Sequence, residues 1–156
     1  MAENQHPAKA AEQQAAGLGE ANALIDAPHM PADAGEYAPA LQRILSRIPN
    51  GWGRWISLDA GWYPIIGDCD EQLAAIDPNY VVHQVKEKLG GLRYYCRPST
   101  EDLPDQQQQR FTRIVAAAEA TAARTCERCS ATATLRDRRG WLKTLCNACA
   151  AELNYP

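Results

Sequence analysis

Apolar residues at helical spacing predict three helices before residue 125. The first helix is expected from about residue 36 to 48, where Pro49-Asn50-Gly51 would end it. The second is expected over 62–76, with Pro64 in its first turn, and the third over 105–124. A short Trp-rich connection separates the first two helices. Each helix presents an apolar stripe, so all three are expected to pack against a common core.

Residues 80–97 change to the two-residue period of β-strands, and Gly90-Gly91 interrupts that period. Glycine tolerates positive φ at both central positions of a two-residue turn, so the segment predicts a hairpin with the two glycines as its turn. In that register Val85 faces Cys96, and His83 belongs to the mostly apolar side that is expected to be buried. The opposite side is expected to face solvent and contains Lys86, Lys88, Arg93, Tyr95 and Arg97.

Residues 1–35 are rich in Ala, Gln, Glu, Gly and Pro and contain few branched aliphatic side chains. Such a segment buries too little apolar area to offset its chain entropy, which predicts a disordered tail. A segment that folds on a partner is the alternative. The chain is therefore expected to consist of this tail, an α+β core over 36–125 and a cysteine-rich unit over 126–156.

The chain has 156 residues, of which 46% are hydrophobic and 22% charged, so one ordinary core can form. Its net charge of −3 is uneven, because residues 1–109 sum to −7 and residues 110–156 to +4. Only the C-terminal third could therefore attract a polyanion through its overall charge. No apolar run approaches the ~18 residues of a membrane span, and the first residues lack the pattern of a secretory signal. We expect a cytoplasmic protein whose six cysteines are thiols or metal ligands.

Two matched cysteine pairs give the strongest chemical signal in the chain. Each pair has the form C-x2-C, and sixteen residues separate the pairs. This spacing is typical of four-cysteine zinc sites, in which a hairpin brings four thiolates around one metal ion. All four positions would be filled by protein, so the expected Zn²⁺ is structural rather than catalytic; a pair of redox dithiols is the alternative. The predicted ligands are Cys126, Cys129, Cys146 and Cys149.

The segment from the first to the last of these cysteines, CERCSATATLRDRRGWLKTLCNAC, resembles a treble-clef finger. It is similar in particular to GATA-type fingers, which share the hairpin and the closing Leu-Cys-Asn-Ala-Cys that stands here at 145–149. The resemblance covers about 25 residues. It implies a zinc-stapled hairpin followed by a short helix.

A second resemblance covers roughly residues 50–150. The hairpin sequence QVKEKLGGLRYY, followed by a helix and by the pattern CxxC…GWLxTLCxxC, resembles a group of small bacterial and bacteriophage proteins. The resemblance implies a phage or mobile-element setting in the cytoplasm of a bacterial host. It implies no activity.

The remaining candidate residues favour structural roles. Cys69 and Cys96 fall on inward faces and are expected to be buried thiols. The acidic residues at 68–71 point in different directions on a helix and are expected to be solvated. Because no phosphate loop, nucleophile elbow or H-E-x-x-H motif occurs, we predict no catalytic residues, no small-molecule substrate and no enzyme.

The sequence therefore predicts a non-catalytic zinc protein that binds another macromolecule. The acidic balance of residues 1–109 and the four tryptophans favour a protein partner, in a regulatory or inhibitory role. The binding surface is expected among Lys86, Lys88, Arg93, Tyr95, Arg136, Arg138, Arg139, Trp141 and Lys143. The alternative is a nucleic-acid-binding zinc finger that uses the basic C-terminal third, namely Arg110, Arg113, Arg124, Arg128, Arg136, Arg138, Arg139 and Lys143.

Overall fold

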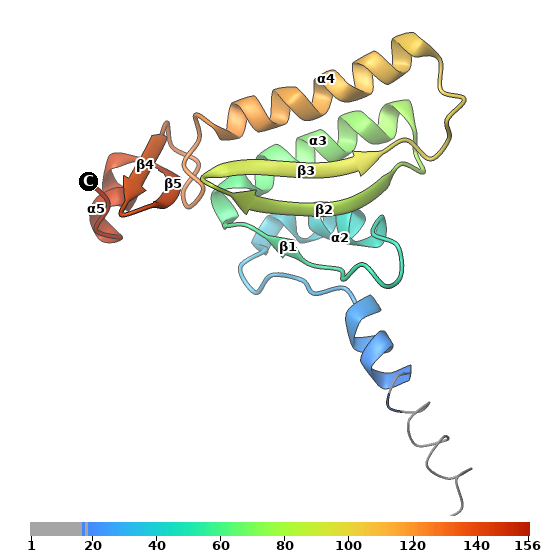
Figure 1. Cartoon of the computed structure of the whole chain (residues 1–156), viewed down its shortest axis with the longest axis horizontal. Coiled ribbons are helices and arrows are strands. Elements are labelled where there is room, and N and C mark those ends of the chain that lie inside the picture. The colour runs from blue at the N-terminus through green and yellow to red at the C-terminus, as the bar shows by residue number, and fades with distance from the viewer. Residues whose placement is uncertain (1–16, 18) are drawn as a thin grey trace, which may run out of the picture.

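The computed structural model describes residue 17 and residues 19–156, and it has the α+β class predicted from the sequence (Figure 1). Three α-helices pack with a three-stranded sheet, and a two-stranded hairpin with a short helix follows at the C-terminal end. Among the described residues, no helix is long and apolar enough to cross a membrane. The elements are, in chain order, η1 (Gly35–Tyr37), α2 (Ala38–Ser46), β1 (Ile56–Ser57), η2 (Ala60–Trp62), α3 (Tyr63–Ile76), β2 (Val81–Lys88), β3 (Gly91–Arg97), α4 (Asp105–Ala122), β4 (Thr134–Arg138), β5 (Trp141–Leu145) and α5 (Asn147–Glu152).

The helices of the core begin where the sequence provides local signals. A proline lies in the first turn of both α2 and α3, where a missing backbone N–H costs no hydrogen bond. The first turn of α4 contains Asp105, whose carboxylate interacts favourably with the helix dipole. The inward side chains of the three helices, among them Leu41, Ile66 and Phe111, join one buried cluster. Burial of this apolar area is what holds the core together.

The sheet has β2 at its centre, with β1 parallel to it on one side and β3 antiparallel on the other. Val82, Val85, Leu92 and Tyr94 are buried in the same cluster as the helices, so the helices cover one face of the sheet. The alternate residues of β2 and β3 are half-buried or exposed. The pattern of the sequence does not predict β1, because two residues are too few to show a period.

The turn between β2 and β3 differs from the predicted one by one residue. Its central residues are Leu89 and Gly90, with φ of 53° and 78°, rather than the two glycines. Val85 consequently pairs with Tyr94 instead of Cys96. The pairing partner of Val85 thus shifts by two residues, which leaves every side chain on its predicted side of the sheet because side chains alternate with a period of two. The residues on the side away from the core are therefore still Lys86, Lys88, Arg93, Tyr95 and Arg97.

A β-bulge overturns the prediction that His83 lies on the buried side of the hairpin. The register shifts between Val82 and Gln84, which interrupts the alternation of side chains at His83. Val82 is buried instead, and the half-buried His83 ring stacks on Trp52, with 4.7 Å between ring centroids and an interplanar angle of 16°.

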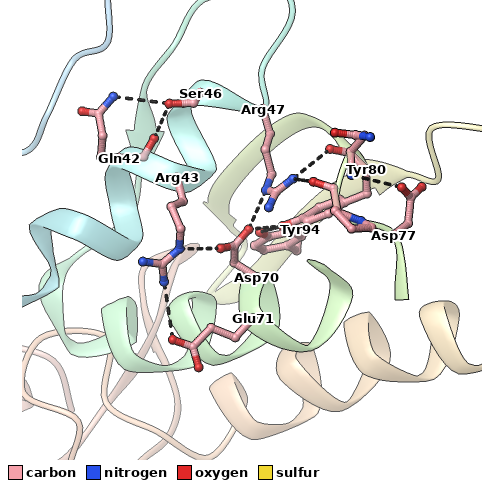
Figure 2. A network of polar contacts seen from close by, with 11 residues as sticks. Gln42, Arg43, Ser46, Arg47, Asp70, Glu71, Asp77, Tyr80 and Tyr94 are labelled. Atoms are coloured by element: carbon pink, nitrogen blue, oxygen red, sulfur yellow. Dashed lines mark hydrogen bonds and ion pairs between the residues drawn. The ribbon is translucent and has the colours of Figure 1, made fainter. Parts of the chain in front are cut away.

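A buried polar network joins two helices to the sheet (Figure 2). Asp70 on α3 is 1% exposed, and its carboxylate accepts hydrogen bonds from Arg43 Nε at 3.2 Å and Arg47 Nε at 2.8 Å. The hydroxyl of Tyr80 donates to the same carboxylate at 2.6 Å, and the hydroxyl of Tyr94 lies 2.7 Å from that of Tyr80. The network fixes α2, α3 and β3 relative to one another, since a buried carboxylate without partners would be strongly destabilising.

The network also corrects the prediction for the acidic residues at 68–71. Asp68 and Glu71 are exposed as expected, but Asp70 lies inside the core because α3 turns that position toward the two arginines of α2.

Contacts with the core begin before the expected tail boundary at residue 35. Residues 19–26 are helical, and Arg54 binds the end of this helix: its backbone N–H donates to Ile25 O at 3.3 Å and its guanidinium to Asp26 O at 2.9 Å. These partners are backbone carbonyls, which composition cannot reveal. The first part of the predicted tail lies outside the described residues.

Candidate metal centre

The four predicted cysteine ligands come together in one cluster at the C-terminal end. The Sγ atoms of Cys126, Cys129, Cys146 and Cys149 all lie within 4.8 Å of one another, and none of these cysteines forms a disulfide. A tetrahedral site with metal–sulfur bonds of about 2.3 Å has sulfur–sulfur edges of about 3.8 Å. The cluster is therefore of the right size to hold a metal ion.

The first cysteine pair forms a tight turn directly after α4. Ser130 has a φ of 67° and donates its backbone N–H to Cys126 O, while Cys126 N donates to Ala131 O at 2.7 Å. The chain thus reverses within five residues. This turn, which we call the knuckle, presents the sulfurs of Cys126 and Cys129 on the same side.

The second cysteine pair lies where β5 meets α5. Cys146 is the N-cap residue of α5, and its sulfur accepts the backbone N–H of Cys149 at 3.4 Å. This hydrogen bond is the main reason that the pKa of the Cys146 thiol is lowered to about 7. Thiolates are the form that binds metal ions, so the helix start favours a metal-ligating sulfur here.

The knuckle is packed tightly against the core at Gly61. A Cβ at this position would lie 2.2 Å from Cys126 O, so only glycine allows the two backbones to approach. Gly61 N donates to Glu127 O at 2.8 Å, and Ser130 Oγ donates to Gly61 O at 2.7 Å. The indole of Trp62 donates to Thr125 O at 2.8 Å. The cysteine-rich unit therefore has a defined position on the core.

A second contact joins the β4–β5 hairpin to the β2–β3 turn. Thr144 Oγ1 donates to Gly90 O at 2.6 Å, and a Cβ at Gly90 would lie 2.4 Å from a methyl group of Leu135. Nearby, Lys143 forms an ion pair with Glu127, which is 1% exposed. Burial raises the pKa of Glu127 even though Lys143 favours its charged form.

The basic residues predicted as a binding surface in this unit are largely engaged within the chain. Arg136 donates to Leu145 O and Asn147 Oδ1, and Arg138 donates to Leu153 O. Each of these arginines thus ties the hairpin to the residues that follow it. The remaining predicted binding residues of the unit have different surroundings: Lys143 is paired, whereas Arg139 and Trp141 are exposed.

The predicted binding residues of the core lie on another surface. Lys86, Lys88, Arg93 and Tyr95 occupy the side of the β2–β3 hairpin opposite the helices. These four residues belong to the sheet, whereas the other predicted binding residues belong to the C-terminal β4–β5 hairpin and its turn.

The two cysteines outside the cluster lie in the core. Cys69 is buried and Cys96 is half-buried. Burial raises the pKa of the Cys96 thiol to about 12, with a further contribution from the carboxylate of Glu119, and burial also raises the pKa of Cys69. Neither thiol has the lowered pKa of a reactive cysteine.

Sequence reasoning missed the residues that position the cluster. Gly61 and Thr144 stand in segments whose period gives no sign of a long-range contact, and Glu127 looks like a solvated residue of the first cysteine pair. The only signal available was the pair Gly61-Trp62, a glycine beside a large side chain at the start of a helix.

Comparison of the chain with protein-family models, curated proteins and solved structures finds no match in any of the three.

Proposed function

We propose that the protein is a non-catalytic binding protein that carries one structural Zn²⁺ and acts by binding another protein. Four closely spaced sulfurs support zinc, since thiolate sets of this kind select Zn²⁺ among the common divalent ions. A metal held by four protein ligands has no position left for water or substrate, which supports a structural role. The order of a cysteine turn, a hairpin and a short helix supports the expected resemblance to a treble-clef finger.

Elemental analysis of the protein and of two cysteine variants tests the zinc proposal. We expect one equivalent of zinc in the purified protein, and loss of this zinc after substitution of Cys149 by Ser. Replacement of Cys69, a buried cysteine outside the cluster, by Ser is the matched control and should leave the zinc content unchanged. Absence of stoichiometric metal from the wild-type protein would refute the proposal.

The observation that supports a protein partner is Leu89 at the β2–β3 turn. The residue is 64% exposed and has a φ of 53°, a conformation that glycine and asparagine adopt far more readily than leucine. The chain therefore tolerates both backbone strain and an exposed apolar side chain at one position. Such a combination is expected where a side chain serves binding rather than folding.

Neighbouring residues extend this apolar surface. Leu135 is 56% exposed and packs against Gly90, the second residue of the same turn. We call Leu89 and Leu135 the turn patch. Trp141, which is 73% exposed, pairs with Arg138 and lies on the opposite face of the C-terminal hairpin from Leu135, so it is not part of this patch. Exposed apolar side chains at one end of a molecule suit a protein interface, whose buried centre is more apolar than the rest of the surface.

Affinity capture from a bacterial lysate, with matched variants, tests the proposed partner class. We expect a protein that is retained after nuclease treatment and at high salt, and that is lost with Leu89→Asn. Leu24→Asn is the control, because Leu24 is 68% exposed but belongs to the N-terminal helix. Equal recovery by both variants, or recovery that nuclease abolishes, would contradict the proposal. The resemblance of the hairpin to phage and bacterial proteins makes a bacterial host the first source to test.

A nucleic-acid role for the C-terminal third receives little support from the contacts. Arg128 pairs with Glu152, Lys143 with Glu127, and Arg136 is bound to internal carbonyls. These side chains would have to break their present contacts before they could bind phosphates.

A further inference from the structure

The face of the three-stranded sheet opposite α2, α3 and α4 combines aromatic and basic side chains. We propose that this face binds single-stranded nucleic acid, with bases stacking on its aromatic rings and phosphates bound by its lysines and arginines. The residues of this face differ from Leu89 and Leu135 of the adjoining turn patch, so this activity goes beyond the proposed protein binding.

Positive charges lie close together on this face, and their repulsion lowers the stability of the sheet. Lys86 pairs directly with Arg93 across the two strands, and like charges in directly opposite positions destabilise a sheet. The guanidinium of Arg93 lies next to Gly91, and Gly91 pairs with Lys88. Lys86, Lys88 and Arg93 are therefore close neighbours on the hairpin. Within the described part of the chain, none of the three forms an ion pair with a carboxylate.

The strands place no carboxylate on this face to offset those cations. Glu87 is the only acidic residue in β1, β2 and β3. The side chain of Glu87 lies on the other side of the sheet, where its carboxylate accepts a hydrogen bond from the backbone N–H of Gly90. The face is therefore complementary to a polyanion, although the chain as a whole is acidic.

Aromatic side chains lie beside the cations of this face. Tyr95, 42% exposed, pairs with Gln84, and the exposed Trp55 directly precedes β1 on the other side of β2. The pair of Gln84 and Tyr95 lies two residues along the strands from the pair of Lys86 and Arg93, a distance of about 7 Å. Aromatic rings beside phosphate-binding cations are the combination that single-strand-binding proteins use, because every base has a face that can stack.

A third ring extends the platform. Trp52 is 60% exposed, and its ring stacks on that of His83 at the bulge of β2. The stacked histidine holds the indole in place, so less side-chain entropy is lost when a base covers it.

The edges of the sheet argue against an extended peptide as the occupant. Peptides usually add to a sheet by pairing with an edge strand. The edge at β1 is already occupied, since His29 forms a bridge with Trp55. At the β3 edge the carboxylate of Glu119 accepts the backbone N–H of Tyr94. What remains available is the flat face, which suits stacked bases.

Fluorescence anisotropy with a labelled oligothymidylate of about 20 nucleotides tests the proposal on the zinc-loaded full chain. We expect Lys86→Ala/Arg93→Ala to weaken binding at low salt by tenfold or more. The slope of log K against log salt should fall by about 1.4, because each phosphate contact to a single strand contributes about 0.7. The comparison is Arg110→Ala/Arg113→Ala, which removes two exposed cations of α4 that the alternative nucleic-acid surface of the C-terminal third would use. A loss of less than twofold in this variant separates the sheet face from that alternative surface.

Substitutions of Tyr95 separate stacking from charge. Tyr95→Ala should weaken binding about tenfold with the salt slope unchanged, and Tyr95→Phe should restore it, because phenylalanine keeps the ring. The proposal is overturned if the wild-type chain does not bind the oligonucleotide, or if Tyr95→Ala binds like wild type. It is also overturned if the α4 variant loses as much affinity, or if polyglutamate competes as well as the oligonucleotide, which would point to an acidic protein. Thermal unfolding of each variant establishes that it is folded.

Discussion

Substitution of Leu89 by Asn should make the protein more stable while it weakens binding to a protein partner. The residue has a φ of 53°, and an ordinary L-residue in this left-handed conformation costs about 1–2 kcal/mol. Asparagine tolerates the conformation well. The leucine side chain is 64% exposed, so roughly a third of its burial free energy, about 0.7 kcal/mol, is lost on substitution. The expected net gain in the free energy of unfolding is about 0.5–1 kcal/mol.

Thermal unfolding followed by circular dichroism measures this gain. For a chain of this size a gain of about 0.5–1 kcal/mol corresponds to a rise in Tm of about 1–4 °C. Leu24→Asn is again the matched control: the same change at an equally exposed leucine in the helix over 19–26 should lower stability slightly, because asparagine is a poorer helix former.

The two readouts together distinguish a binding role from a folding role. If Leu89 serves the fold, Leu89→Asn lowers Tm and any loss of binding follows from unfolding. If it serves binding, Tm rises while captured partner is lost. A variant that is less stable than wild type would refute the reasoning, because the strain at Leu89 would then be outweighed by contacts that the turn needs.

Three further predictions concern the core and its contact with the knuckle. Gly61→Ala should destabilise the protein by about 1–3 kcal/mol in urea unfolding, since its Cβ would lie 2.2 Å from a backbone oxygen, whereas the control Gly67→Ala in α3 meets only a methyl group at 3.4 Å. Burial alone would raise the pKa of Asp77, but hydrogen bonds from Ser99 and Asn79 lower it overall. Its carboxylate therefore stabilises the fold above the unfolded pKa of about 3.9, and the stability difference between wild type and Asp77→Asn should shrink as pH falls through the lower, folded pKa; a constant difference from pH 6 to 3 would contradict this. Cys96, with a pKa of about 12, should be alkylated by iodoacetamide far more slowly than a free thiol at neutral pH, as mass spectrometry of the zinc-loaded protein can show.

Local patterns predicted the elements well, because their signals lie within a few residues. The apolar stripes place α3 and α4 within two residues of their observed ends, and the spacing of the cysteine pairs brings four sulfurs together as expected. In these cases the periodicity, the prolines and the cysteine spacing all indicate the same structure.

The features that were not predicted depend on contacts between distant segments. An X-Gly and a Gly-Gly turn satisfy similar backbone requirements, and the choice of Leu89-Gly90 accompanies a tertiary hydrogen bond from Thr144 to Gly90 O. The bulge at His83 coincides with a stacking contact to Trp52 in another loop. Composition likewise gives the number of cations but not their partners, so the engagement of Arg136 with internal carbonyls could not be anticipated.

Because of where they lie, the two proposed binding surfaces should depend on zinc to different extents. The core and the cysteine-rich unit have separate buried clusters, so the core has its own apolar packing. The turn patch, however, spans both units, because Leu89 belongs to the β2–β3 turn and Leu135 to β4. Tyr95 lies on a strand whose inner face packs against α4. Chelation of zinc should therefore abolish capture of the protein partner and leave most of the oligonucleotide binding. If chelation abolishes both activities equally, the core depends on the metal for its own folding and the two surfaces are not independent.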